Sequence, residues 1–122
     1  MNNPVGWFEI YVDNVARAKA FYEAVFELTL TPMEMPGCEM QTFPMAEDGK
    51  GISGAIIKMD DNAPGAGGTV VYFSCADCAV EAERVGAAGG KVVVEKTSIG
   101  PNGFIAMAID TEGNSIGLHS MA

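Results

Sequence analysis

Residues 7–28 combine two hydrophobic patterns. From Trp7 to Val12 successive side chains alternate in character, which predicts a β-strand with two different faces. The apolar face consists of Phe8, Ile10 and Val12, and the other face consists of Trp7, Glu9 and Tyr11. We expect the apolar face to pack under the following helix, and the mixed face to line a wet, concave surface.

A helix is predicted directly after this strand. Asn14 is a good N-cap residue, and apolar residues then recur at helical spacing. The predicted buried face of the helix contains Ala18, Phe21, Tyr22, Val25 and Phe26. The chain therefore begins with a strand, a tight turn and an amphipathic helix.

Three further strands complete the first half of the chain. They are predicted at Thr29–Met33, Cys38–Met45 and Ile52–Met59. A turn at residues 35–37 and a polar turn at residues 47–51 separate them. Residues 60–68 are small, polar and turn-forming, which is typical of a linker.

The second half repeats the same pattern. Strand Thr69–Cys75 precedes the N-cap Asp77 and a helix over Cys78–Ala88. The three strands that follow are predicted at Lys91–Lys96, Phe104–Ile109 and Ser115–Met121. Both halves thus have the order β-α-β-β-β.

A constant offset relates the two halves. Adding 63 to Asn14 gives Asp77, and adding 63 to Gly54 gives Gly117. A length of 122 residues suits one domain. We therefore predict a single domain over residues 1–122, with module one at about 5–59, a linker at 60–68 and module two at about 69–121.

Charge and cysteine content limit the partners and the compartment. Sixteen acidic residues against seven basic ones give a net charge of −9, and the absence of a basic run disfavours nucleic acid or an anionic membrane as a partner. No apolar run reaches transmembrane length, and residues 1–7 lack signal-peptide features. Three cysteines fit a reducing compartment. We expect a cytoplasmic protein.

Several segments carry a resemblance to a known family. They are Phe8-Glu9-Ile10, Val12-Asp13-Asn14, Arg17, Ala18, Phe21-Tyr22, Val25-Phe26, Ala87-Ala88-Gly89-Gly90, Gly103-Phe104 and Asp110-Thr111-Glu112-Gly113-Asn114. The chain resembles the vicinal oxygen chelate superfamily, which includes glyoxalases, bleomycin-resistance proteins and extradiol dioxygenases. The last segment departs from the family's usual Asp-Pro-Asp-Gly-Asn at Thr111. The resemblance implies an α+β fold in which two βαβββ modules form a curled, cup-like mixed and antiparallel sheet, usually within a homodimer.

Metal-using members of that superfamily place four His, Glu or Gln ligands inside the cup. The resemblance maps these positions onto Trp7, a residue near Gly54, Val70 and Gly117. None of these side chains is a ligand for a divalent metal. We therefore expect no metal and no other cofactor.

One polar set remains, two residues further along the strands. It consists of Glu9, Tyr72 and His119, with Ile56 or Ile57 in the fourth place. A carboxylate beside an imidazole is a workable acid–base pair, so Glu9 and His119 are the best catalytic candidates. The alternatives are a buried structural pair and a contact with a bound ligand.

Sulfur-containing residues offer weaker hypotheses. Cys75 and Cys78 form a CxxC motif before a helix, and Cys38 and His119 complete a Cys₃His zinc set. The alternative is that these cysteines pack as small apolar groups. The eight methionines, including Met33, Met35, Met40, Met45 and Met107, either line an adaptable apolar pocket or fill the core.

Three functions follow from these observations. The first is a metal-free protein that binds a small molecule in the cup through Trp7, Glu9, Tyr11, Tyr72 and His119. The second is a glyoxalase-type lyase or isomerase in which Glu9 and His119 transfer a proton, with or without a metal at a shifted site. The third is an interaction module or an enzyme subunit whose cup is filled by side chains.

Overall fold

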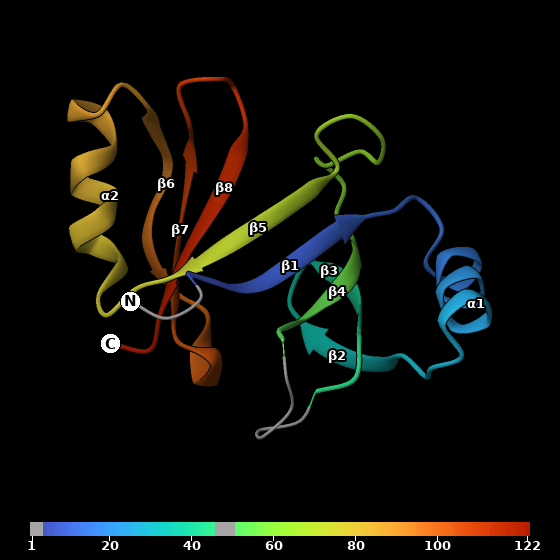
Figure 1. Ribbon diagram of the computed structural model, residues 1–122. Helices are drawn as coiled ribbons and strands as arrows, with labels where there is room; N and C mark the ends of the chain where they lie inside the picture. Colours follow the sequence, from blue (N-terminus) through green and yellow to red (C-terminus); the bar gives the residue numbers. More distant parts are fainter. Residues whose placement is uncertain (1–3, 46–50) are drawn as a thin grey trace. The chain divides into compact units, whose positions relative to one another are not determined.

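The computed structural model describes residues 4–45 and 51–122. The first half contains β1 (Val5–Tyr11), α1 (Val15–Phe26), β2 (Thr31–Met35), β3 (Cys38–Thr42) and β4 (Ser53–Lys58). The second half contains β5 (Thr69–Ser74), α2 (Cys78–Ala87), β6 (Lys91–Ser98), the 3₁₀ turn η1 (Gly100–Asn102), β7 (Phe104–Ile109) and β8 (Ser115–Ser120) (Figure 1). The predicted α+β class and the βαβββ pattern of both modules are confirmed.

Two compact units make up the described chain. One unit spans Trp7–Thr69, and the other contains Val70–Ala122 together with the described residues before Trp7. The order of strands within the first unit is β2-β3-β4-β1, and within the second it is β5-β8-β7-β6. In each unit the first and last strands of the module pair in parallel and the remaining neighbours pair antiparallel, so both sheets are mixed.

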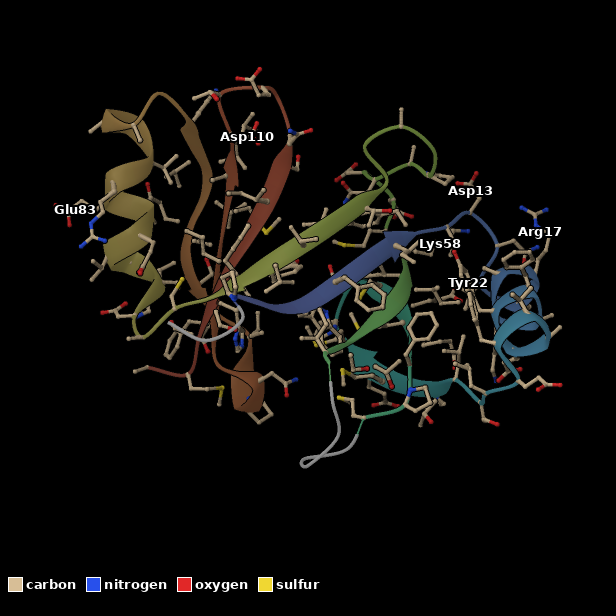
Figure 2. The ribbon with its side chains drawn as sticks, viewed as in Figure 1. Asp13, Arg17, Tyr22, Lys58, Glu83 and Asp110 are labelled. Carbon is tan, nitrogen blue, oxygen red and sulfur yellow. The ribbon has the colours of Figure 1, made fainter. Side chains whose placement is uncertain are left out.

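Helix α1 covers one face of the first sheet. Its core cluster contains Val12, Val15, Leu30 and Ile56, with Ile10, Ala18, Tyr22, Leu28 and Phe43 packed against it. Tyr22 lies on the side of α1 that faces the strands, and its ring centroid is 5.6 Å from that of Phe43 (Figure 2). The apolar face predicted for β1 is therefore the face under the helix.

The predicted buried face of α1 was too broad. Phe21, Val25 and Phe26 are 53–60% exposed, and only Ala18 and Tyr22 of the predicted set reach the core. A helix of 12 residues resting on a sheet buries a narrow stripe, and the side chains beside that stripe stay in solvent. Among the described residues, neither helix is long and apolar enough to cross a membrane.

Both predicted N-caps are confirmed. Asn14 Oδ1 accepts a hydrogen bond from the backbone N–H of Arg17 at 2.9 Å, and Asp77 Oδ1 accepts one from Ala79 at 3.0 Å. Helix α2 packs on a cluster of Cys78, Ala82, Ala106 and Leu118, joined by Phe73, Cys75, Val92 and Phe104. The second module therefore buries the equivalent face of its first strand.

The β2–β3 hairpin differs from its predicted boundaries. Strand β2 begins at Thr31, two residues later than predicted, because Leu30 is buried in the core as part of the preceding loop. The strand continues to Met35, and the predicted turn is a two-residue loop of Pro36 and Gly37, with Gly37 at φ 81°. Most of the predicted turn at residues 47–51 lies outside the described residues.

Acid is expected to weaken the second module through two carboxyl groups. The Lys96 ammonium, 2.8 Å away, and the Ala79 backbone N–H lower the pKa of Asp77. Hydrogen bonds from Asn114 and Glu112 lower the pKa of Asp110, which is labelled in Figure 2. Folding therefore releases protons here, so this contribution is present above about pH 4 and is lost as the pH falls further. Thermal unfolding between pH 5 and pH 2 should show a smaller loss in the Asp77→Asn, Asp110→Asn double variant. An unchanged slope contradicts this assignment.

Candidate functional site

The face of the first sheet opposite α1 carries the predicted site residues of β1. Trp7 pairs with Ser53, Glu9 with Ala55 and Tyr11 with Ile57, and paired residues on neighbouring strands point to the same side. Strand β3 adds Met40 and Thr42 to this helix-free face, because they pair with Ile57 and Ala55. Trp7, Glu9 and Tyr11 therefore share one face, as predicted.

The register identifies the predicted residue near Gly54 as Ser53. Gly54 pairs with Phe8 on the helix side of the sheet, so the neighbour of Trp7 on the helix-free face is Ser53. The fourth member of the polar set was predicted as Ile56 or Ile57. Ile56 belongs to the core under α1, whereas Ile57, the partner of Tyr11, lies on the helix-free face. The residue paired with Glu9 is Ala55.

The two modules differ by one residue between their first and last strands. Ala55 follows Glu9 by 46 positions, whereas Gly117 follows Tyr72 by 45. Gly117 is therefore the equivalent of Ala55, and the predicted match between Gly54 and Gly117 was wrong by one residue. The offset of 63 holds for the helix caps but not for the last strand, because the elements and connections between them differ in length and leave a net difference of one residue.

Tyr72 and His119 share the helix-free face of the second sheet. Tyr72 pairs with Gly117, and His119 is two residues further along β8, opposite Ser74. The Tyr72 ring lies directly over Gly117, where an added Cβ would be 2.2 Å from a ring carbon. A glycine at this position is what allows Tyr72 to lie flat and 7% exposed.

His119 is anchored by the backbone of η1. Its Nε2 lies 2.6 Å from the carbonyl oxygen of Asn102. A carbonyl only accepts, so Nε2 carries a proton and donates it. Any proton that His119 takes up from another group must therefore bind to Nδ1. The sequence did not predict this contact, because Asn102 and His119 are 17 residues apart in the chain and only folding brings them together.

Glu9 is the buried carboxyl group of the first helix-free face. It is 8% exposed, and the Trp7 indole Nε1–H donates a hydrogen bond to its Oε2 at 3.2 Å. Burial of a carboxylate is costly unless hydrogen bonds or a positive charge compensate it. The indole supplies part of this compensation, and it fixes the carboxylate beside a flat aromatic ring.

Tyr11 and Cys38 lie next to this carboxylate. Burial, the Glu9 charge and Cys38 together raise the pKa of Tyr11 to about 12. Burial and then Glu9 raise the pKa of the Cys38 thiol as well. Glu9, Tyr11 and Cys38 thus form one electrostatically linked group. Cys38 was predicted only as a possible zinc ligand, and its place beside Glu9 was not predicted.

A prediction for alkaline pH follows from Tyr11. Its pKa is higher in the folded chain than in the unfolded chain, so its stabilising contribution is complete below about pH 10 and disappears as the pH rises towards about 12. The Tyr11→Phe variant should lose less thermal stability than the parent between pH 9 and pH 11. Glu9→Gln should lower the Tyr11 pKa in an ultraviolet titration of tyrosinate. A Tyr11 pKa unaffected by Glu9→Gln contradicts their proximity.

The residues at the family's metal positions do not fit a divalent ion. Trp7 and Ser53 occupy the equivalent places in the first sheet. In the second sheet these places fall to Val70 and, by the register that pairs Tyr72 with Gly117, to Ser115 in place of the predicted Gly117. These residues offer no imidazole or carboxylate. Within residues 4–45 and 51–122, no group of three or more His, Cys, Asp or Glu side chains is arranged to hold a metal.

The CxxC motif lies in the core of the second module. Cys78 is fully buried, and Cys75 packs against the same cluster under α2. Burial is the largest cause of a raised Cys75 pKa, with Glu81 and Cys78 adding to it. The thiol is therefore not activated by the nearby helix N-terminus, and packing as a small apolar group explains both cysteines.

Comparisons with known proteins agree with this architecture. Residues 5–43 match the family model described as bleomycin resistance protein-like, N-terminal. Two mycobacterial proteins, from Mycobacterium bovis and Mycobacterium tuberculosis and provisionally named glyoxylase CFP32, are 33% identical over 108 residues, which is 88% of this chain. Methylmalonyl-CoA epimerase from M. tuberculosis superposes with a TM-score of 0.69 at 16% identity, over 98% of this chain and 88% of the epimerase chain. The chain belongs to the vicinal oxygen chelate superfamily.

A second solved structure has the same fold as this chain. The hypothetical protein BH1468 from Bacillus halodurans has a TM-score of 0.74 at 13% identity, covering 98% of this chain and 95% of the other. The mycobacterial relatives are longer, and the aligned part is 40% of their length. The predicted glyoxalase-like and bleomycin-resistance-like character of this superfamily member is therefore confirmed at the family level.

Proposed function

We propose that this superfamily member binds a small, flat organic cation on the helix-free face of its first sheet, without a divalent metal. The observation that carries the proposal is the buried Glu9 carboxylate, held by the indole of Trp7 and next to Tyr11. A carboxylate flanked by aromatic rings attracts a desolvated cation through both charge and cation–π contacts.

The net charge of the chain supports a cationic ligand. At −9, the long-range field attracts cations and repels anions. The bleomycin-resistance-like family model over residues 5–43 covers β1, which carries the Trp7, Glu9 and Tyr11 face. The donor set at the family's metal positions does not fit a divalent ion, so the proposal contains no metal-dependent step.

Ligand binding can be tested through the fluorescence of Trp7, which is the single tryptophan of the chain. Metal-free bleomycin and a panel of aromatic cations should change this fluorescence, whereas neutral compounds of the same shape should not. Glu9→Gln should weaken binding by about tenfold to a hundredfold, the usual range for a charged hydrogen-bond partner.

A matched control separates the site from the overall field. Glu83→Gln removes one negative charge from the exposed surface of α2 (Figure 2) and should leave affinity unchanged. Equal losses in the Glu83 and Glu9 variants would show that only net charge matters. If no cation in the panel binds, the proposed function is wrong.

A second candidate is proton transfer at a carbon next to a carbonyl group. The protonated Tyr11 hydroxyl, with its pKa near 12, lies close to Glu9, which gives one potential proton donor beside one potential base. Superfamily structures similar to this chain include methylmalonyl-CoA epimerase. A buried carboxylate in such a setting is the type of group that removes a proton from carbon.

Isotope exchange tests this alternative. Methylmalonyl-CoA incubated with the protein in D₂O should gain one mass unit if a proton is removed and replaced, and Glu9→Gln should abolish the gain while Glu83→Gln does not. His119→Gln should preserve exchange if Glu9 is the base. An unchanged mass with this thioester, together with cation binding, favours the first proposal.

A further inference from the structure

The β2–β3 hairpin carries four sulfur-containing side chains on one face. Met33 pairs with Met40, and Met35 pairs with Cys38 across the two-residue loop. Residues two apart on a strand point to the same side, and paired residues share a side, so all four lie together. The function proposed above does not require them.

The strand pairing places the four side chains within reach of one another. Directly opposite residues in an antiparallel pair have Cβ atoms about 4.5–5.5 Å apart, and diagonal neighbours are still within reach of long side chains. An open hollow of about 600 Å³ runs along the hairpin and is lined by residues 32–36 and 38–41, which include all four. Met40 is 6% exposed, while Met33, Met35 and Cys38 are half-buried, so the sulfurs are shielded but accessible.

The donor chemistry favours a soft, monovalent ion. Thioether and thiolate sulfur select copper(I), whereas oxygen ligands suit magnesium and calcium. One thiolate and three neutral thioethers balance a single positive charge. The nearby Glu9 carboxylate, which shares this face and interacts electrostatically with Cys38, adds negative potential.

We propose that the hairpin binds one copper(I) ion through the Cys38 thiolate and the thioethers of Met33, Met35 and Met40. The Cys38 thiol loses one proton to solvent when the ion binds, and the ion keeps its oxidation state. This position is on β2 and β3, apart from Trp7 on β1 and Ser53 on β4. The ordinary alternative is that the methionines only pack as apolar groups.

Silver(I) is a suitable redox-inert probe in chloride-free buffer. The experiment uses the full chain with Cys75→Ser as the background, because Cys75 is a second half-buried thiol, whereas Cys78 is fully buried. With ¹³C-methyl-labelled methionine, the signals of Met33, Met35 and Met40 should shift at one equivalent of silver(I). The signal of Met107, in the second module, should not move.

Variants then assign the ligands. In the same background, Cys38→Ser and Met40→Leu should each weaken copper(I) affinity by at least about tenfold in competition with a chromophoric chelator. Met107→Leu is the matched control and should have no effect, and circular dichroism checks the fold of each variant. The proposal is overturned if the three methyl signals stay unchanged, or if Cys38→Ser binds copper(I) as tightly as the background.

Discussion

Replacing Gly54 by alanine is expected to lower the free energy of unfolding by about 3 kcal/mol, at the upper end of the usual cost of overpacking. A Cβ at this position would lie 2.4 Å from the Phe8 carbonyl oxygen and 2.6 Å from the Phe8 ring. Both obstacles are in β1, the parallel partner of β4. The backbone oxygen cannot move without breaking the ladder that supports the site residues of β1.

Gly86→Ala is the matched control for this substitution. Gly86 is in α2, and a Cβ there meets nothing within 4 Å. Alanine should therefore stabilise the chain by about 0.5–1 kcal/mol through its higher helix propensity. Chemical denaturation measures both variants. A Gly54→Ala variant as stable as the parent would contradict the close approach of β1 and β4.

The second large effect is expected at Gly103, the residue after η1. Its φ of 101° and ψ of −134° are almost restricted to glycine, and a Cβ would lie 2.4 Å from the Ser120 carbonyl oxygen. Gly103→Ala should cost about 3 kcal/mol from backbone strain and overpacking together. It should also displace the neighbouring Asn102 carbonyl, which accepts the hydrogen bond from His119.

Gly100→Ala separates these two causes. Gly100 also has a positive φ, of 80°, but a Cβ there enters open space, so only the strain of about 1–2 kcal/mol applies. Nitrogen NMR of His119 should show Nε2 protonated in the parent and in Gly100→Ala, and a mixture of tautomers in Gly103→Ala. Equal effects of the two alanines on stability would exclude the contact with Ser120.

Sequence pattern predicted the fold well where local chemistry determines it. Asn14 and Asp77 cap their helices as expected, because a short polar side chain directly before a helix can accept a hydrogen bond from a backbone N–H of the first turn. The alternation in β1 likewise separated Ile10, under the helix, from Glu9, on the other face. These features depend on residues close together in the chain.

Features that depend on pairing between distant strands were predicted less well. The one-residue difference between the modules led to a match of Gly117 with Gly54, whereas the strand pairing matches Gly117 with Ala55. A shift of one residue moves a side chain to the opposite face. The contact of His119 with Asn102 and the proximity of Cys38 to Glu9 depend on tertiary packing in the same way.

The outermost strands of the two modules have a consequence for behaviour at high concentration. Strand β2 includes Pro32, which lacks an N–H, and β6 breaks its register with β7 twice, after Val92 and after Val94. A continuous, flat row of free backbone groups is what recruits strands from other molecules into fibrils. The proline in β2 and the irregular pairing of β6 interrupt such a row of backbone groups. These two strands should therefore resist amyloid growth, although Val93 and Val94 are exposed.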